Sequence, residues 1–225
     1  VEFADQMAVA ARLVREVPEV AALVRDQFRV VLLDEYQDTS AAQAQLLQGL
    51  FSGPDAEQGR GHPVTAVGDP YQAIYGWRGA AASNILQFGT DFPDAQGRPA
   101  TAYALRVNRR SGTQILAVAN ELAVGLRSDP VLADVTGDNI LVAPSQAPPG
   151  RVAAATFTTW NEEVTWLADQ VVSARVGGDA ATWSDIAVLT RRNADIGPLY
   201  AELISRDVPV EIVGLGGLLE LPEVR

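Results

Sequence analysis

Two adjacent acids at the end of an apolar run are the first candidates for chemistry. Residues 30–33 (Val-Val-Leu-Leu) are followed directly by Asp34 and Glu35. A buried strand of an open α/β fold delivers the residues after its end to the carboxyl edge of the sheet, where ligands bind. There one carboxylate can bind Mg²⁺, and the next can orient and deprotonate a water in nucleotide hydrolysis. Taken alone, such a pair is more often a solvated surface turn, so the interpretation depends on its neighbours.

A second apolar run, residues 64–67, ends about thirty residues later in a polar and aromatic loop, residues 68–80. Gln72 offers a neutral amide that can sense a terminal phosphate. Trp77 offers a flat face on which an unpaired base can stack, worth roughly 1–3 kcal/mol per base. Arg78 can meet a phosphate or a carboxylate. Singly, Trp77 would be a core aromatic and Arg78 a surface charge, but their company in one glycine-containing loop favours a functional site.

Two neighbouring guanidinium groups form the third candidate, in the run Asn108-Arg109-Arg110-Ser111. Guanidinium groups at the edge of a nucleotide cleft stabilise the charge that gathers on a transferring phosphoryl group. A solvated basic turn explains this run equally well when it is considered alone.

The elements that must position these residues alternate between short apolar runs and amphipathic runs, which is typical of an α/β fold with a helix-covered parallel sheet. Ser40 with Gln43, and Ser111 with Gln114, have the spacing of helix capping boxes, and a further helix is expected from Asn161. We place a domain boundary near residue 100, which gives domains of residues 1–100 and 101–225. Strands are expected at residues 30–33, 64–67, 102–105, 152–157, 186–189 and 210–213.

Composition excludes several classes of protein. With 48% hydrophobic residues in 225 the chain is globular, and its net charge of −11 argues against a generic cationic nucleic-acid coat. Without cysteine there is no disulfide framework, and the single histidine makes zinc chemistry improbable. No apolar run is long enough for a membrane helix, so we expect a cytoplasmic protein without a membrane partner. The chain begins without Met, and we expect it to be a piece of a longer protein.

In order and spacing, the three candidate runs resemble those of the UvrD/Rep/PcrA-like superfamily 1 DNA helicases. Residues 34–39 are similar to helicase motif II, residues 68–80 to motif III and residues 108–111 to motif IV. The most specific part is Gln-Ala-Ile-Tyr-Gly-Trp-Arg-Gly at residues 72–79. The resemblance covers nearly the whole chain and implies two partial motor domains built on RecA-like parallel sheets flanked by helices.

For the nucleotide, the resemblance implies ATP and Mg²⁺ as cofactors. It implies Asp34 and Glu35 at the metal, with Glu35 also the base for the attacking water. Gln72 and Arg110 would lie at the γ-phosphate. One departure is Arg109, where most of these helicases have an aromatic residue on the adenine. A guanidinium plane can also stack on a purine, so Arg109 is expected to bind the base, with its base preference open.

For DNA, the resemblance implies that Tyr75, Trp77 and Arg78 lie along a single strand or couple it to ATP. The expected partners are single-stranded DNA, duplex junctions and a repair protein, in a cytoplasmic, nucleoid-associated location. The expected function is the central segment of an ATP-dependent helicase or translocase, of 3′-to-5′ polarity, in DNA repair or recombination.

One absence limits what the segment can do alone. All 17 basic residues are arginine, so the chain has no lysine for a Walker A phosphate loop. We therefore expect the segment by itself neither to hydrolyse ATP at a useful rate nor to unwind duplex DNA.

Two alternatives stay open. Residues 76–80 and 212–219 are also similar to the helicase–nuclease subunits of actinobacteria that process double-strand breaks. From a different class, the chain would be a noncatalytic scaffold that binds another repair protein.

Overall fold

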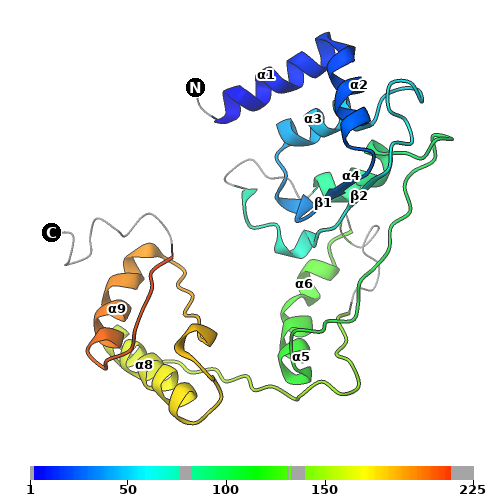
Figure 1. The fold of residues 1–225 in the computed structure, drawn as a ribbon. Helices are drawn as coiled ribbons and strands as arrows, with labels where there is room; N and C mark the ends of the chain where they lie inside the picture. The colour runs from blue at the N-terminus through cyan, green and yellow to red at the C-terminus, as the bar shows by residue number, and fades with distance from the viewer. Residues whose placement is uncertain (1–2, 77–82, 131, 133–139, 214–225) are drawn as a thin grey trace. The chain divides into compact units, whose positions relative to one another are not determined.

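The computed structural model describes residues 3–76, 83–130, 132 and 140–213 (Figure 1). Contacts divide the chain into two compact units, Val1–Val152 and Ala153–Arg225. The predicted motor-domain boundary near residue 100 stays a prediction. Among the described helices, none is long and apolar enough to cross a bilayer.

The first unit contains a two-stranded parallel sheet. Strand β1 (Val31–Leu33) pairs with β2 (Val64–Ala66), in the register that sets Val31 opposite Val64. These strands confirm the first two predicted runs. Four longer helices belong to this part of the unit: α1 (Phe3–Glu16), α2 (Pro18–Gln27), α3 (Ala41–Phe51) and α4 (Ser83–Asp91).

The core of this region lies on one face of the sheet. Buried Tyr36, Phe51 and Phe92 pack there with the inward side chains of both strands, and the rings of Tyr36 and Phe88 meet edge to face at 5.4 Å. The side chain of Leu32 points to the other face and is 77% exposed. Because successive side chains of a strand point to opposite faces, one face of the sheet is buried. Among the described residues, no helix or loop covers the other face.

Helix α3 begins as its sequence predicts. The Ser40 hydroxyl accepts from Gln43 N, and Gln43 Oε1 accepts from Ser40 N at 2.9 Å, which closes the capping box. Each bond satisfies a backbone N–H that the first turn of a helix would otherwise leave unpaired.

The second predicted capping box, Ser111 with Gln114, is wrong for helix α5 (Thr113–Leu122). Its N-cap is Gly112 rather than Ser111. Pro148 O and Pro149 O accept from the first N–H groups of the helix, those of Thr113 and Gln114, at 3.2 and 2.8 Å. A distant backbone segment therefore provides the acceptors that a capping side chain would have supplied. The short helix α6 (Val124–Arg127) follows.

The second unit is a helical pair. Helices α8 (Trp160–Val176) and α9 (Ile196–Ile204) enclose a core of Ala168, Val171 and Leu203. The predicted helix from Asn161 is thus confirmed, with its start one residue earlier, after the N-cap Thr159. Single turns of 3₁₀ helix occur in both units: η1 (Tyr36–Asp38), η2 (Pro70–Gln72), η4 (Trp183–Asp185) and η5 (Asn193–Asp195).

The four later strand predictions are wrong for the described residues. The structure assigns no strand at residues 102–105, 152–157, 186–189 or 210–213, although Val107 and Val142 form an isolated parallel bridge. A strand exists only where a neighbour accepts and donates its backbone hydrogen bonds. These runs have strand-like composition without such a neighbour, and Tyr103 and Leu189 are 86% and 93% exposed.

Candidate functional site

The two predicted acids leave β1 in an unusual backbone conformation. Glu35 has φ 49° and ψ 41°, in the left-handed region that non-glycine residues avoid at a cost of roughly 1–2 kcal/mol. Asp34 Oδ1 accepts from Glu35 N at 3.0 Å, and Glu35 O accepts from Asp38 N at 2.9 Å as η1 begins. Such strain persists only where the surroundings enforce it, and it occurs preferentially at functional positions. Both side chains are exposed at the carboxyl end of β1.

Gln37 joins this loop to the loop that follows β2. Its Nε2 donates to Glu35 Oε2 at 2.7 Å, and its Oε1 accepts from Asp69 N at 3.1 Å. The side chain is 1% exposed, and both ends of its amide are used. No role was predicted for Gln37, although a polar residue between Tyr36 and Asp38, just after the acidic pair, was the available signal.

Gln72 is held in turn by Asp69. The Asp69 carboxylate caps η2, accepting from Tyr71 N at 2.9 Å through Oδ1 and from Gln72 Nε2 at 2.8 Å through Oδ2. An unbroken chain of contacts therefore runs from Glu35 through Gln37 and Asp69 to Gln72. Two of the predicted site residues, Glu35 and Gln72, are thus brought into one bonded set by Gln37 and Asp69, for which no role was predicted.

Gly68 is required by the close approach of these loops. A Cβ atom at this position would lie 2.5 Å from Gln37 Oε1 and 3.3 Å from Tyr36 N. Real Cβ atoms do not come that close to an oxygen, so any side chain here displaces the Gln37 amide.

Arg109 and Arg110 lie in a separate turn that is built locally. Asn108 Oδ1 accepts from both Arg110 N and Ser111 N, at 2.9 and 2.8 Å. Both arginine side chains are exposed. Within the described ranges, no hydrogen bond or ion pair joins this turn to Asp34, Glu35 or Gln72, so a shared site with them stays a prediction.

The predicted DNA-binding residues are described only in part. Tyr75 is 37% exposed, after η2. Trp77 and Arg78 lie outside the described residues, so their role stays a prediction.

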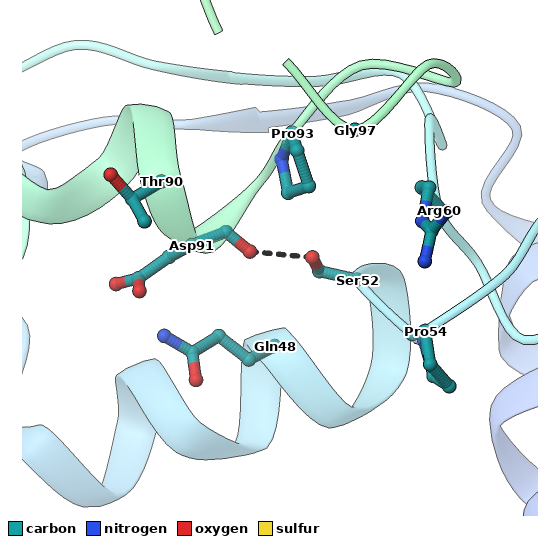
Figure 2. A pocket seen from close by; sticks show the side chains of 9 residues that line it. Gln48, Ser52, Pro54, Arg60, Thr90, Asp91, Pro93 and Gly97 are labelled. Carbon is teal, nitrogen blue, oxygen red and sulfur yellow. Dashed lines mark hydrogen bonds between the residues drawn. The ribbon is translucent and has the colours of Figure 1, made fainter. Parts of the chain in front are cut away.

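Burial raises the pKa of two side chains in this region, Tyr36 and Asp91. Burial raises the pKa of Tyr36 to about 12, with a further contribution from the nearby charge of Asp91. Burial also raises the pKa of Asp91, which a hydrogen bond from Gln48 partly opposes. Asp91 lines a hollow of about 580 Å³ between α3 and α4, where the Ser52 hydroxyl donates to the Asp91 carbonyl (Figure 2). None of the predicted site residues lines this hollow.

The donor set fits Mg²⁺ only if a ligand completes it. Among the described residues, no group of three acidic, histidine or cysteine side chains could enclose a metal ion. Asp34 Oδ2 and Glu35 Oε1 have no hydrogen-bond partner in the described part of the chain, so each can offer an oxygen. Mg²⁺ is usually bound in this way, by one or two carboxylates together with phosphate oxygens and water.

Two family models match the chain. The UvrD/REP helicase N-terminal domain matches residues 1–93, and the UvrD-like helicase C-terminal domain matches residues 103–225.

Similar proteins support the match. Over its whole length the chain is 32% identical to the ATP-dependent DNA helicase UvrD1 of Mycobacterium leprae and 30% identical to the ATP-dependent DNA helicase PcrA of Leuconostoc citreum. Over 54% of its length it is 38% identical to PcrA of Staphylococcus aureus. The chain spans 27%, 27% and 15% of these three relatives.

Proposed function

This chain belongs to the UvrD-like helicase family, and from that premise we propose that it is the central motor segment of an ATP-dependent DNA helicase. The observation that carries the proposal is the bonded chain from Glu35 to Gln72. It joins the carboxylate of Glu35, at the end of β1, to the amide of Gln72, in the loop after β2. Hydrolysis of a nucleotide would need an acid and an amide of this kind close to its phosphates.

In this proposal Asp34 and Glu35 have different roles at the phosphates. Asp34 would bind Mg²⁺ directly, and the ion when bound neutralises charge on phosphate oxygens. Glu35 would meet the ion through a water, so that its free oxygen stays available as a base. Glu35 Oε1 is the oxygen left to orient the attacking water and take its proton, because Oε2 accepts from Gln37. Gln72 and Arg110 would meet the γ-phosphate, and Arg109 would stack on the base.

The wider role follows from the family. We propose two partial RecA-like motor domains that close around ATP and move a single strand past Tyr75, Trp77 and Arg78. Polarity of 3′ to 5′, a role in DNA repair or recombination and a nucleoid-associated location belong to the same proposal. The cited relatives are described as helicases, which favours a helicase over a helicase–nuclease subunit.

The test is the substitution Glu35→Gln in the full-length parent protein. Loss of the base should lower the kcat of DNA-stimulated ATP hydrolysis by about 10²–10⁴-fold, since general bases contribute that much. The matched control is Glu57→Gln, the same chemical change on an exposed glutamate in the loop after α3. Unchanged turnover in Glu35→Gln would refute the catalytic assignment of Glu35. A parent protein that shows no DNA-stimulated turnover, and that keeps its protein partner after Glu35→Gln, would favour the noncatalytic scaffold.

A second experiment addresses the segment alone. Because the chain has no lysine to reach the β- and γ-phosphates, we propose that the isolated 225 residues do not turn over ATP. A steady-state ATPase assay with and without single-stranded DNA tests this, and DNA-stimulated turnover would contradict it.

A further inference from the structure

We propose that Gln37 is a positioning residue that fixes the Glu35 carboxylate for water activation and couples it to the loop of Gln72. The inference rests on the proposed function, because it deepens the role of the same two loops. The observation behind it is a fully buried amide with one end on each loop.

The orientation of the amide is fixed by chemistry. Asp69 N–H can only donate, so the atom of Gln37 that meets it must be the acceptor Oε1. The NH₂ end then necessarily faces Glu35 Oε2. Only a side chain with a donor and an acceptor at this length can serve both loops.

The surroundings leave Gln37 no alternative position. Its backbone belongs to η1. Two backbone hydrogen bonds fix this turn, from Asp38 N to Glu35 O and from Thr39 N to Tyr36 O. Gly68 lies so close to Oε1 that even a methyl group would not fit between them. A buried amide that is held at one end by the Glu35 carboxylate and at the other by the Asp69 backbone N–H transmits displacement, because an interior of this kind is close-packed.

The same geometry explains how Gln72 could influence Glu35. Gln72 Nε2 donates to Asp69 Oδ2, while Asp69 N donates to Gln37 Oε1. A phosphate oxygen that draws the Gln72 amide away competes with Asp69 for that donor. The change reaches Glu35 through Asp69, from its carboxylate to its backbone N–H, and then through the Gln37 side chain. It acts on the carboxylate of a residue whose backbone is already strained.

The experiment compares Gln37→Glu with Gln43→Glu in the full-length parent protein. The first replaces the donor to Glu35 by an oxygen at nearly constant shape. The second makes the same change in the α3 capping box, where an oxygen still accepts from Ser40 N. We expect Gln37→Glu to lower kcat of DNA-stimulated ATP hydrolysis by about 10–100-fold with KM for ATP within about threefold, because misplaced catalytic groups lose rate rather than binding. Gln43→Glu should leave kcat within about twofold.

A double-substitution cycle separates positioning from a merely structural role. If Gln37 acts through Glu35, adding Gln37→Glu to Glu35→Gln should lower the residual single-turnover rate by less than about twofold. A structural role would lower that rate by the full factor seen with Glu35 intact. Because Gln37→Glu adds a buried charge that could impair folding, Gln37→Met, of similar length without donor or acceptor, is measured beside it. ATP-analogue affinity verifies the fold of each variant.

The outcomes are distinct. Wild-type-like kcat in Gln37→Met, or a full additional loss in the Glu35→Gln background, overturns the inference and leaves the proposed function standing. If Glu35→Gln itself leaves turnover unchanged, the proposed function fails and the inference fails with it.

Discussion

The loops after β1 and β2 and the turn at residues 108–111 present their candidate side chains in different ways. The first pair of loops is tied together by long-range bonds through a buried amide and rests on the core residue Tyr36. The turn is tied only to itself, through Asn108 Oδ1. Glu35 and Gln72 are therefore constrained by the fold, whereas Arg109 and Arg110 have preorganised backbone and exposed side chains. From this difference we predict that the arginines gain their final positions from a ligand.

Among the tests of this comparison, the largest effect is expected on its arginine side. In the full-length parent protein, Arg110→Ala should lower kcat for DNA-stimulated ATP hydrolysis by about 10²–10³-fold, because it removes the charge that we propose meets the phosphoryl group. Arg109→Ala should instead raise KM and alter the preference between ATP and GTP, with kcat less affected. The control is Arg12→Ala on α1, whose side chain is 62% exposed. Equal kcat losses for Arg109 and Arg110 would contradict the division of roles.

The second prediction concerns Tyr36, the anchor of the constrained loops. Its pKa is raised from 10.0 to about 12, so the folded state favours the neutral phenol. The resulting stability is fully present below pH 10 and is lost as pH rises from 10 through 12, an effect of about 2–3 kcal/mol for a shift of this size. Thermal unfolding of the chain between pH 9 and 12 measures it.

Tyr36→Phe is the matched variant for that measurement. The Tyr36 hydroxyl is buried without a hydrogen-bond partner among the described residues, so its removal should cost little stability near pH 7. The variant should lose the part of the alkaline destabilisation that is due to Tyr36. An identical fall in unfolding temperature for both proteins would mean that another group causes it.

How far the sequence predicted these features depends on the range of the interactions. The α3 capping box is local, three residues apart, and was predicted correctly. The bond from Gln37 to Asp69 joins residues 32 apart and has no periodic signature, so no pattern indicated it. The Ser111 cap failed for the same reason, because Pro148 O and Pro149 O, distant in sequence, supply the acceptors.

The strand predictions show the same dependence. Composition predicted both β1 and β2, and the backbones of these two strands pair in parallel. Residues 186–189 have similar composition and form no strand, because composition specifies a tendency and pairing needs a partner. For the site, which side chains carry chemistry stays a prediction from the sequence, and the structure shows that Glu35 and Gln72 belong to one bonded set.

The third prediction breaks the link between the constrained loops without touching a candidate catalytic residue. Gly68→Ala places a Cβ 2.5 Å from Gln37 Oε1, so the amide must move. We expect kcat to fall by about tenfold, since small displacements of a catalytic group are costly. Gly125→Ala in α6 is the control, because a Cβ there meets nothing within 4 Å. Unaltered kcat in Gly68→Ala would show that the loops do not depend on this contact.

The smallest effect is expected at the turn. Asn108→Ala removes the acceptor for Arg110 N and Ser111 N. The free energy that stabilises the folded turn should fall by about 1 kcal/mol. Because the arginine side chains are already exposed, kcat should fall by only about two- to fivefold, less than Gly68→Ala produces in the other region. Asn108→Asp keeps the accepting oxygen and should restore the rate. Steady-state ATPase of the full-length parent protein measures both variants. A loss in Asn108→Ala as large as that of Arg110→Ala would mean that this turn, like the loops after β1 and β2, positions its side chains before a ligand binds.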